Sequence, residues 1–90
     1  MTDTRLFLGE LLITKGAKAQ LHIPDAVHAL NRHSKCDFGE VSEADKEANM
    51  EALEHGDRIL SAYTDRNGIR FWIITEADRT TTTILLPEDY

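Results

Sequence analysis

An Asn67-Gly68 pair between two runs of strand-forming residues constrains the fold more than any other feature of this chain. Asn-Gly is the strongest short hairpin signal, because both central residues of the favoured two-residue turn need positive φ. The flanking runs cover 59–64 and 70–75, and a third run, rich in β-branched threonine, covers 81–86. The sequence therefore predicts three consecutive antiparallel strands, a β-meander.

Two helices are expected before these strands. Pro24 and Asp25 suit the first turn of a helix that begins near Ile23. Ser42 is a good N-cap for a second helix, and Gly56 is the residue expected to end it in the left-handed conformation. Both helices precede the meander, so they are available to pack against its sheet.

The N-terminal part adds one short strand. Apolar runs at 6–8 and 11–14 predict a strand that ends near Thr14, with Gly16 in the turn that follows. The predicted order is β-α-α-β-β-β. A length of 90 residues allows one domain. We therefore expect a single compact α+β domain over 1–90, an antiparallel β-meander packed with two helices.

Acidic residues are concentrated in the middle of the chain. The formal net charge is -6, and the segment 37–57 holds eight acids against a single base, Lys46. Alanines at 44, 48 and 52 form a stripe expected to let the second helix approach the sheet closely. A second stripe on that helix is acidic and spans roughly a quadrant; its members are Glu43, Glu47, Glu51 and Glu54. This balance argues against a protein that reads nucleic-acid sequence and favours a basic partner surface.

Groups suited to catalysis or metal binding are few. His33 and Cys36 have His-x-x-Cys spacing, but a closed structural metal site needs four ligands and only Asp37 is a convenient third. Cys36 could pair with His33 or His55 for nucleophilic catalysis, yet no glycine-rich oxyanion loop accompanies it. We therefore expect no catalytic residue, no metal site and no cofactor, and instead a packed thiol and surface histidines.

The C-terminal signature W-I-I-T-E-A-D-R-x-x-T-T-I-L-L-P-x-x-Y runs from Trp72 to Tyr90. Three further stretches, at 14–17, 32–40 and 56–63, accompany it. Together these motifs resemble a family of small proteins carried by bacterial plasmids and integrative elements, commonly labelled plasmid-related proteins. The resemblance covers the chain from about Leu8 to its end, more weakly at 17–31.

This chain departs from that family at two positions. The family usually carries glycine where Cys36 stands and tryptophan where Phe38 stands, which weakens any catalytic or metal role for Cys36. The resemblance implies a mobile-element origin and the cytoplasm of a bacterial host. It implies no reaction.

A non-catalytic inhibitor of host defence, anti-CRISPR or anti-restriction, is the leading hypothesis, by analogy with other small acidic proteins of mobile elements. Its partner would be a basic surface of a defence protein or ribonucleoprotein. No basic-then-apolar leader and no membrane-spanning apolar run is seen. The residues expected to contact the partner are Asp37, Glu40, Glu43, Glu47, Glu51, Glu54, Glu76, Asp78 and Arg79.

Two alternatives stay open. A small enzyme or cation-dependent protein would need the second and third loops to converge, with a polar set drawn from both. That set is His33, Asp37, Glu76, Asp78 and Arg79. A structural module would instead form a homodimer through the edge of the sheet, using the first or the last strand.

Overall fold

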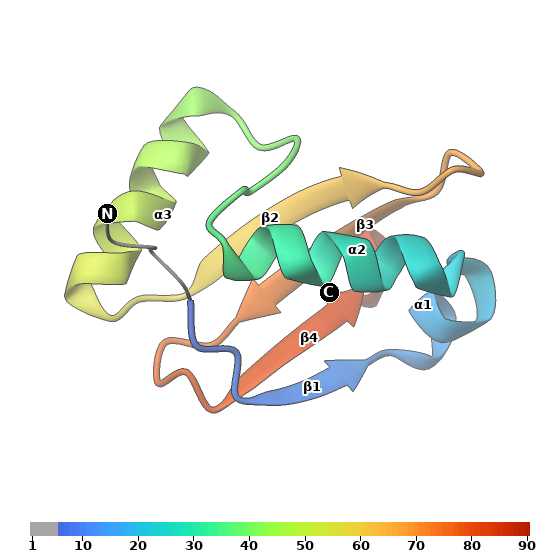
Figure 1. Cartoon of the computed structure of the whole chain (residues 1–90), viewed down its shortest axis with the longest axis horizontal. Helices are drawn as coiled ribbons and strands as arrows, with labels where there is room; N and C mark the ends of the chain where they lie inside the picture. Colours follow the sequence, from blue (N-terminus) through green and yellow to red (C-terminus); the bar gives the residue numbers. More distant parts are fainter. Residues whose placement is uncertain (1–5) are drawn as a thin grey trace.

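The computed structural model describes residues 6–90, which form a four-stranded sheet in the order β1-β4-β3-β2 with α2 lying across one face (Figure 1). The three C-terminal strands are the predicted antiparallel meander. A 3-10 helix, η1, follows them. In chain order the elements are β1 (Glu10–Ile13), α1 (Lys15–Gln20), α2 (Ile23–Ser34), α3 (Glu43–His55), β2 (Ile59–Thr64), β3 (Arg70–Thr75), β4 (Thr81–Leu85) and η1 (Pro87–Asp89).

The first strand departs from the prediction of a purely antiparallel sheet. β1 pairs with β4 in parallel, from Glu10 against Thr81 to Ile13 against Ile84, so the sheet is mixed. A parallel pair needs a long crossover, and here the chain between the two strands includes all three α-helices and the other two strands. Local patterns predicted β1 itself but could not show a partner so distant in sequence.

A third α-helix, α1, lies where a turn was predicted. The Thr14 hydroxyl caps it by accepting the N–H of Ala17 at 3.2 Å, and Gly16 lies inside the helix instead of in a turn. The same hydroxyl donates to Asp89 at 2.6 Å. A Cβ on Gly16 would stand 3.1 Å from the Asp89 carboxylate, so glycine allows this close contact. Nothing in the sequence around Thr14 predicts this contact with Asp89, which lies near the C-terminus.

The hairpin between β2 and β3 is confirmed, but its turn is not the expected type. Only Gly68 has positive φ, at 81°, and its N–H donates to the carbonyl of Asp65. Asp65 and Ile69 close the strands, and the Asp65 carboxylate accepts the N–H groups of Asn67 and Ile69 at 3.0 and 2.9 Å. The geometry is that of a three-residue hairpin whose glycine forms a bulge.

The helix caps behave as the sequence predicts. The Ser42 hydroxyl accepts the N–H of Asp45 at 3.1 Å and begins α3. Gly56 ends this helix with φ of 73°. Both ends of α3 are therefore fixed by residues that the sequence identifies.

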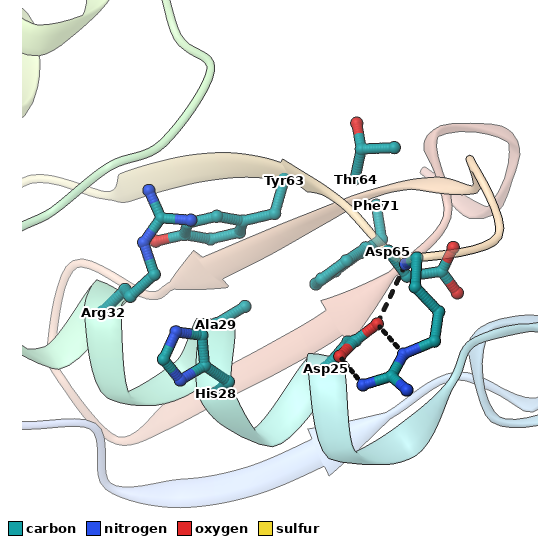
Figure 2. Close-up of a pocket in the computed structure, with 9 residues that line it drawn as sticks. Asp25, His28, Ala29, Arg32, Tyr63, Thr64, Asp65 and Phe71 are labelled. Carbon is teal, nitrogen blue, oxygen red and sulfur yellow. Dashed lines mark hydrogen bonds and ion pairs between the residues drawn. The ribbon is translucent and has the colours of Figure 1, made fainter.

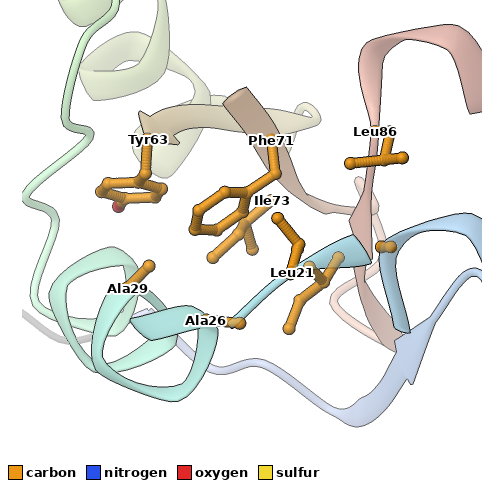
Figure 3. Packing of buried hydrophobic residues seen from close by; sticks show 9 residues of the cluster. Leu21, Ala26, Ala29, Tyr63, Phe71, Ile73 and Leu86 are labelled. Carbon is orange, nitrogen blue, oxygen red and sulfur yellow. The ribbon is translucent and has the colours of Figure 1, made fainter. Parts of the chain in front are cut away.

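The core consists of two clusters of buried side chains. The larger lies between the sheet and the helices α1 and α2 (Figure 3); it comprises Ala17, Leu21, Ala26, Ala29, Tyr63, Phe71, Ile73, Ile84 and Leu86. Ala26, Ala29 and His33 form the buried face of α2, whereas Val27 is 58% exposed. The smaller cluster includes one residue of α3 and one of β2; it comprises Leu6, Phe38, Ala52 and Ile59.

Candidate functional site

The acidic helix α3 contacts the rest of the protein through a narrow strip. Only Asn49 and Ala52 are buried, and the other two alanines of the predicted stripe, Ala44 and Ala48, are exposed, so that stripe is not a packing surface. The side-chain amide of Asn49 orients the helix instead. It donates to the Leu60 carbonyl at 2.8 Å and accepts the Leu60 N–H at 3.2 Å.

The outer surface of α3 is anionic. Lys46 lies 3.5 Å from Glu43, and this is the one ion pair on the helix among residues 6–90. Met50, 52% exposed, adds an apolar side chain to the same surface. The four glutamates of the predicted acidic face are all exposed: Glu43, Glu47, Glu51 and Glu54. A helix held along one strip thus directs its carboxylates into solvent.

The acids of the loop before α3 have partners within the fold. Arg32 donates to both oxygens of Asp37, at 2.8 and 3.1 Å, and this hydrogen bonding lowers the pKa of Asp37. The Arg32 guanidinium also lies 4.9 Å from the centre of the Tyr63 ring, a cation–π distance. Glu40 accepts the hydroxyl of Thr64 at 2.9 Å. Both acids brace the loop beside β2.

Arg79 supports α3 from the turn between β3 and β4. Its guanidinium donates to the carbonyl of Ala52 at 3.0 Å and to that of Asp57 at 2.6 Å. A cation at the C-terminal end of a helix satisfies unpaired carbonyls and complements the helix dipole. Arg79 therefore holds the end of the acidic helix, a structural contact that its place in the C-terminal signature did not indicate.

The five residues of the enzymatic alternative have separate partners. His33 is fully buried and Asp37 pairs with an arginine of α2. Glu76 lies 3.5 Å from an arginine, and Asp78 accepts two hydrogen bonds from a threonine in its own turn. His33 reaches Thr75, the residue before Glu76, but only in the interior. Among residues 6–90 no hydrogen bond or ion pair joins two of these five side chains, so they do not form one centre.

A row of hydrogen bonds crosses the interior of the sheet. The Nδ1 and Nε2 atoms of His33 lie 2.5 Å from the Ser61 hydroxyl and 2.8 Å from the Thr75 hydroxyl. Thr75 contacts the hydroxyl of Thr82 at 2.8 Å, and Thr82 donates to the carbonyl of Leu8 at 2.7 Å. Because that carbonyl only accepts, each hydroxyl must donate onward, which places the imidazole proton on Nε2 and leaves Nδ1 to accept from Ser61.

This row corrects the expectation that the histidines lie on the surface. The side chains of His33, Ser61, Thr75 and Thr82 are completely buried, so no substrate reaches them. Burial lowers the pKa of His33 to about 4, which keeps the ring neutral near pH 7. A sequence signal did exist, since His33 follows Ala26 and Ala29 at the spacing of one helix face.

A cavity of about 290 Å³ opens between α2 and the β2–β3 hairpin (Figure 2). Tyr63 and Phe71 supply aromatic rings, and Arg32 lies at the side. Arg66 donates to both oxygens of Asp25, at distances from 2.9 to 3.1 Å, and these bonds lower the pKa of Asp25 to about 2. Both arginines thus already have carboxylate partners. None of the residues expected to contact a partner lines this cavity.

Comparisons with protein-family models, curated proteins and solved structures found no match to this chain. Within residues 6–90, no three histidine, cysteine or acidic side chains gather where they could hold a metal ion. None of the helices in that range has the length and apolarity to cross a membrane. What the protein does must be inferred from its own surfaces.

Cys36 occupies a strained backbone position after α2. Its φ is 64°, in the left-handed region that favours glycine. The thiol is half-buried, which raises its pKa and makes it a poorer nucleophile near neutral pH. Glycine would adopt the same backbone at this position without steric cost. Position 36 therefore holds a thiol that is only weakly nucleophilic near neutral pH.

Proposed function

We propose that this protein is a non-catalytic binding protein that presents α3 to a basic surface of another macromolecule. The observation that supports this is the contrast among its acids. Within residues 6–90, Glu47, Glu51 and Glu54 have no cationic partner, whereas Asp25 and Asp37 are held by arginines. Unpaired charges on a projecting helix accelerate encounter with an opposite charge and select the partner that carries it.

The partner we propose is a host-defence nuclease or its RNA-guided complex, so that binding would be anti-CRISPR or anti-restriction. Such proteins hold nucleic acid in positively charged channels that contact phosphates. A row of carboxylates on a helix can occupy such a channel in place of phosphates. The resemblance of the C-terminal signature to plasmid-related proteins places this class first among those to be tested.

The test compares two double variants that change net charge equally. Glu47→Gln/Glu51→Gln alters the α3 surface, and Asp57→Asn/Glu88→Gln alters exposed acids outside it. Each variant is expressed in bacterial strains that each carry one restriction or CRISPR system, and phage plating is counted. We expect the wild type and the second variant to raise plating in at least one strain, and the first variant to lose that effect.

Binding of the purified target then measures the charge contribution directly. Exposed ion pairs contribute up to about 1 kcal/mol each, so the α3 variant should bind about tenfold more weakly at low salt. That difference should shrink as salt rises. Plating unaffected by the wild type in every strain, or an α3 variant as active as the wild type, would overturn the proposal.

A further inference from the structure

The outer edge of β1 carries three exposed apolar side chains in a row. β1 lies at the opposite side of the sheet from β2 and α3 (Figure 1). Leu11, Leu12 and Ile13 are 54%, 44% and 37% exposed. Soluble proteins usually protect such an edge with lysine, proline or a bulge, and β1 has none of these within its four residues, Glu10–Ile13.

Hydrogen bonds at the two ends of β1 show which of its backbone groups are unused. The N–H of Glu10 donates to the carbonyl of Thr80 at 2.9 Å, and the N–H of Thr14 donates to the carbonyl of Ile84 at 3.0 Å. Alternate residues of a strand point their backbone groups to the same side. The N–H and C=O groups of Leu11 and Ile13 therefore face away from β4, where residues 6–90 provide no partner.

The same side of the molecule carries exposed apolar residues of α2. Ile23 and Val27 are 43% and 58% exposed, and they lie on the flank of α2 opposite to Asp25, which lines the cavity beside β2. Leu11 stands opposite Thr82 in the register, so its side chain lies on the face of the sheet that α2 covers. Strand and helix thus contribute to one apolar margin.

We propose that a second copy of this chain covers that margin, with the two β1 strands paired antiparallel about a twofold axis at Leu12. Leu11 of each copy then stands opposite Ile13 of the other, and all four outward N–H and C=O groups of each strand find partners. The charges also match, because Glu10 at the start of one strand comes near Lys15, the first residue of α1 in the other copy. A parallel arrangement would instead place like charges together.

The twofold pairing makes one continuous eight-stranded sheet. α3 packs at the β2 edge through Asn49, so the two acidic helices lie at the far ends of the dimer and their mutual repulsion is weak. A dimer with two distant acidic helices would engage a partner bivalently. The pairing itself rests on β1 and stands whether or not α3 binds a defence protein.

Disulfide trapping tests the register. Leu12 faces its own copy in a non-hydrogen-bonded pair, where Cα atoms lie about 4.5 Å apart and a disulfide can form. In a Cys36→Gly background, Leu12→Cys should form a covalent dimer under mild oxidation, whereas Leu11→Cys, on the same exposed strand but offset by two residues from its copy, should not. Equal crosslinking of both variants, or none by Leu12→Cys, would overturn the proposed register.

Sedimentation equilibrium from micromolar to millimolar protein tests the dimer. The wild-type mass should rise towards twice 10.2 kDa. Leu11→Lys should weaken dimerisation at least about tenfold, while Met50→Lys, an equally exposed site on α3, should leave it unchanged. A monomer at every concentration, or a dimer weakened by Met50→Lys and not by Leu11→Lys, would show that β1 does not pair with a second copy.

Discussion

The two edge strands of the sheet, β2 and β1, differ in whether their outward backbone N–H and C=O groups have hydrogen-bond partners. At β2, the outward groups of Leu60 bond the side chain of Asn49, and those of Ala62 bond the segment Phe38–Glu40, with N···O distances of 2.7 and 3.2 Å. At β1, the outward groups have no partner within residues 6–90. The comparison teaches that one amide side chain and three residues of loop can close the edge from Leu60 to Ala62 without a further strand. For the outward backbone groups of Thr64, at the end of β2, residues 6–90 provide no partner.

This asymmetry also separates the surfaces of the molecule by chemistry. The closed edge supports the acidic helix, whose only buried residues are Asn49 and Ala52. The open edge is apolar on strand and helix alike. Charge and apolar surface are therefore placed at opposite ends of one sheet, so the two proposed contacts, with a basic partner and with a second copy, would use separate surfaces.

Substitution of Gly39 should disrupt the β2 edge more than any other change predicted below. Its φ is 70°, and an added Cβ would lie 2.1 Å from the Ala62 carbonyl oxygen. Gly39→Ala should lower the free energy of unfolding by about 3 kcal/mol, since a left-handed alanine costs about 1–2 kcal/mol and two backbone hydrogen bonds to Ala62 contribute about 1 kcal/mol each. Urea unfolding of the purified variant measures this loss.

Gly56→Ala is the matched control for that prediction. Gly56 also has positive φ, 73°, but nothing lies within 4 Å of its added Cβ. This variant should lose only about 1 kcal/mol, the cost of the backbone conformation. Equal losses in the two variants would mean that the close approach of the loop to β2 contributes nothing to stability.

The sequence predicts the local parts of this comparison and misses the tertiary ones. Ser42, Gly56 and the Asn67-Gly68 pair mark helix ends and a hairpin because their effects act within a few residues. The parallel pairing of β1 depends on a strand near the other end of the chain, and the role of Asn49 depends on Leu60. Neither leaves a periodic or motif signal, so neither edge could be assigned as open or closed in advance.

The candidate site likewise has a local part that the sequence predicts and a tertiary part that it misses. Helical spacing alone predicts the acidic face of α3, and its glutamates are exposed as expected. Arg79 was grouped with the contact residues by its motif, but it donates to the carbonyl groups of Ala52 and Asp57. Which charges are free and which are paired depends on neighbours brought together by folding, and no spacing rule reveals that.

The buried row that contains His33 links the two edges and should respond to pH. It runs from Ser61 on β2 to the Leu8 carbonyl just before β1. The folded protein holds the pKa of His33 near 4, below its usual 6.5, so the unfolded chain takes up a proton first as pH falls. Stability should therefore be complete above pH 6.5 and decline by about 3 kcal/mol by pH 4.

Unfolding measured across that range, for the wild type and for His33→Gln, checks this expectation. The variant should be less stable at pH 7 and should lose most of the slope between pH 6.5 and pH 4.5. Nitrogen chemical shifts of the ring provide an independent reading of the proton on Nε2. An unchanged slope in His33→Gln, or a proton on Nδ1 at neutral pH, would contradict the proposed direction of the row.

Asn49→Ala removes only the side-chain amide that bonds Leu60 and leaves the bonds between Ala62 and the 38–40 loop in place. It breaks two hydrogen bonds and leaves the N–H and C=O of Leu60 without partners, so the free energy of unfolding should fall by about 2 kcal/mol. The control is Met50→Ala, at the exposed neighbouring position, which should change that free energy by less than about 0.5 kcal/mol. Hydrogen exchange should accelerate at the Leu60 amide more than at Ala62, whose acceptor, the Phe38 carbonyl, is untouched. Equal acceleration at both amides would instead mean that α3 and the 38–40 loop open as one unit. The hydrogen bonds of Asn49 would then stabilise the whole β2 edge and not only Leu60.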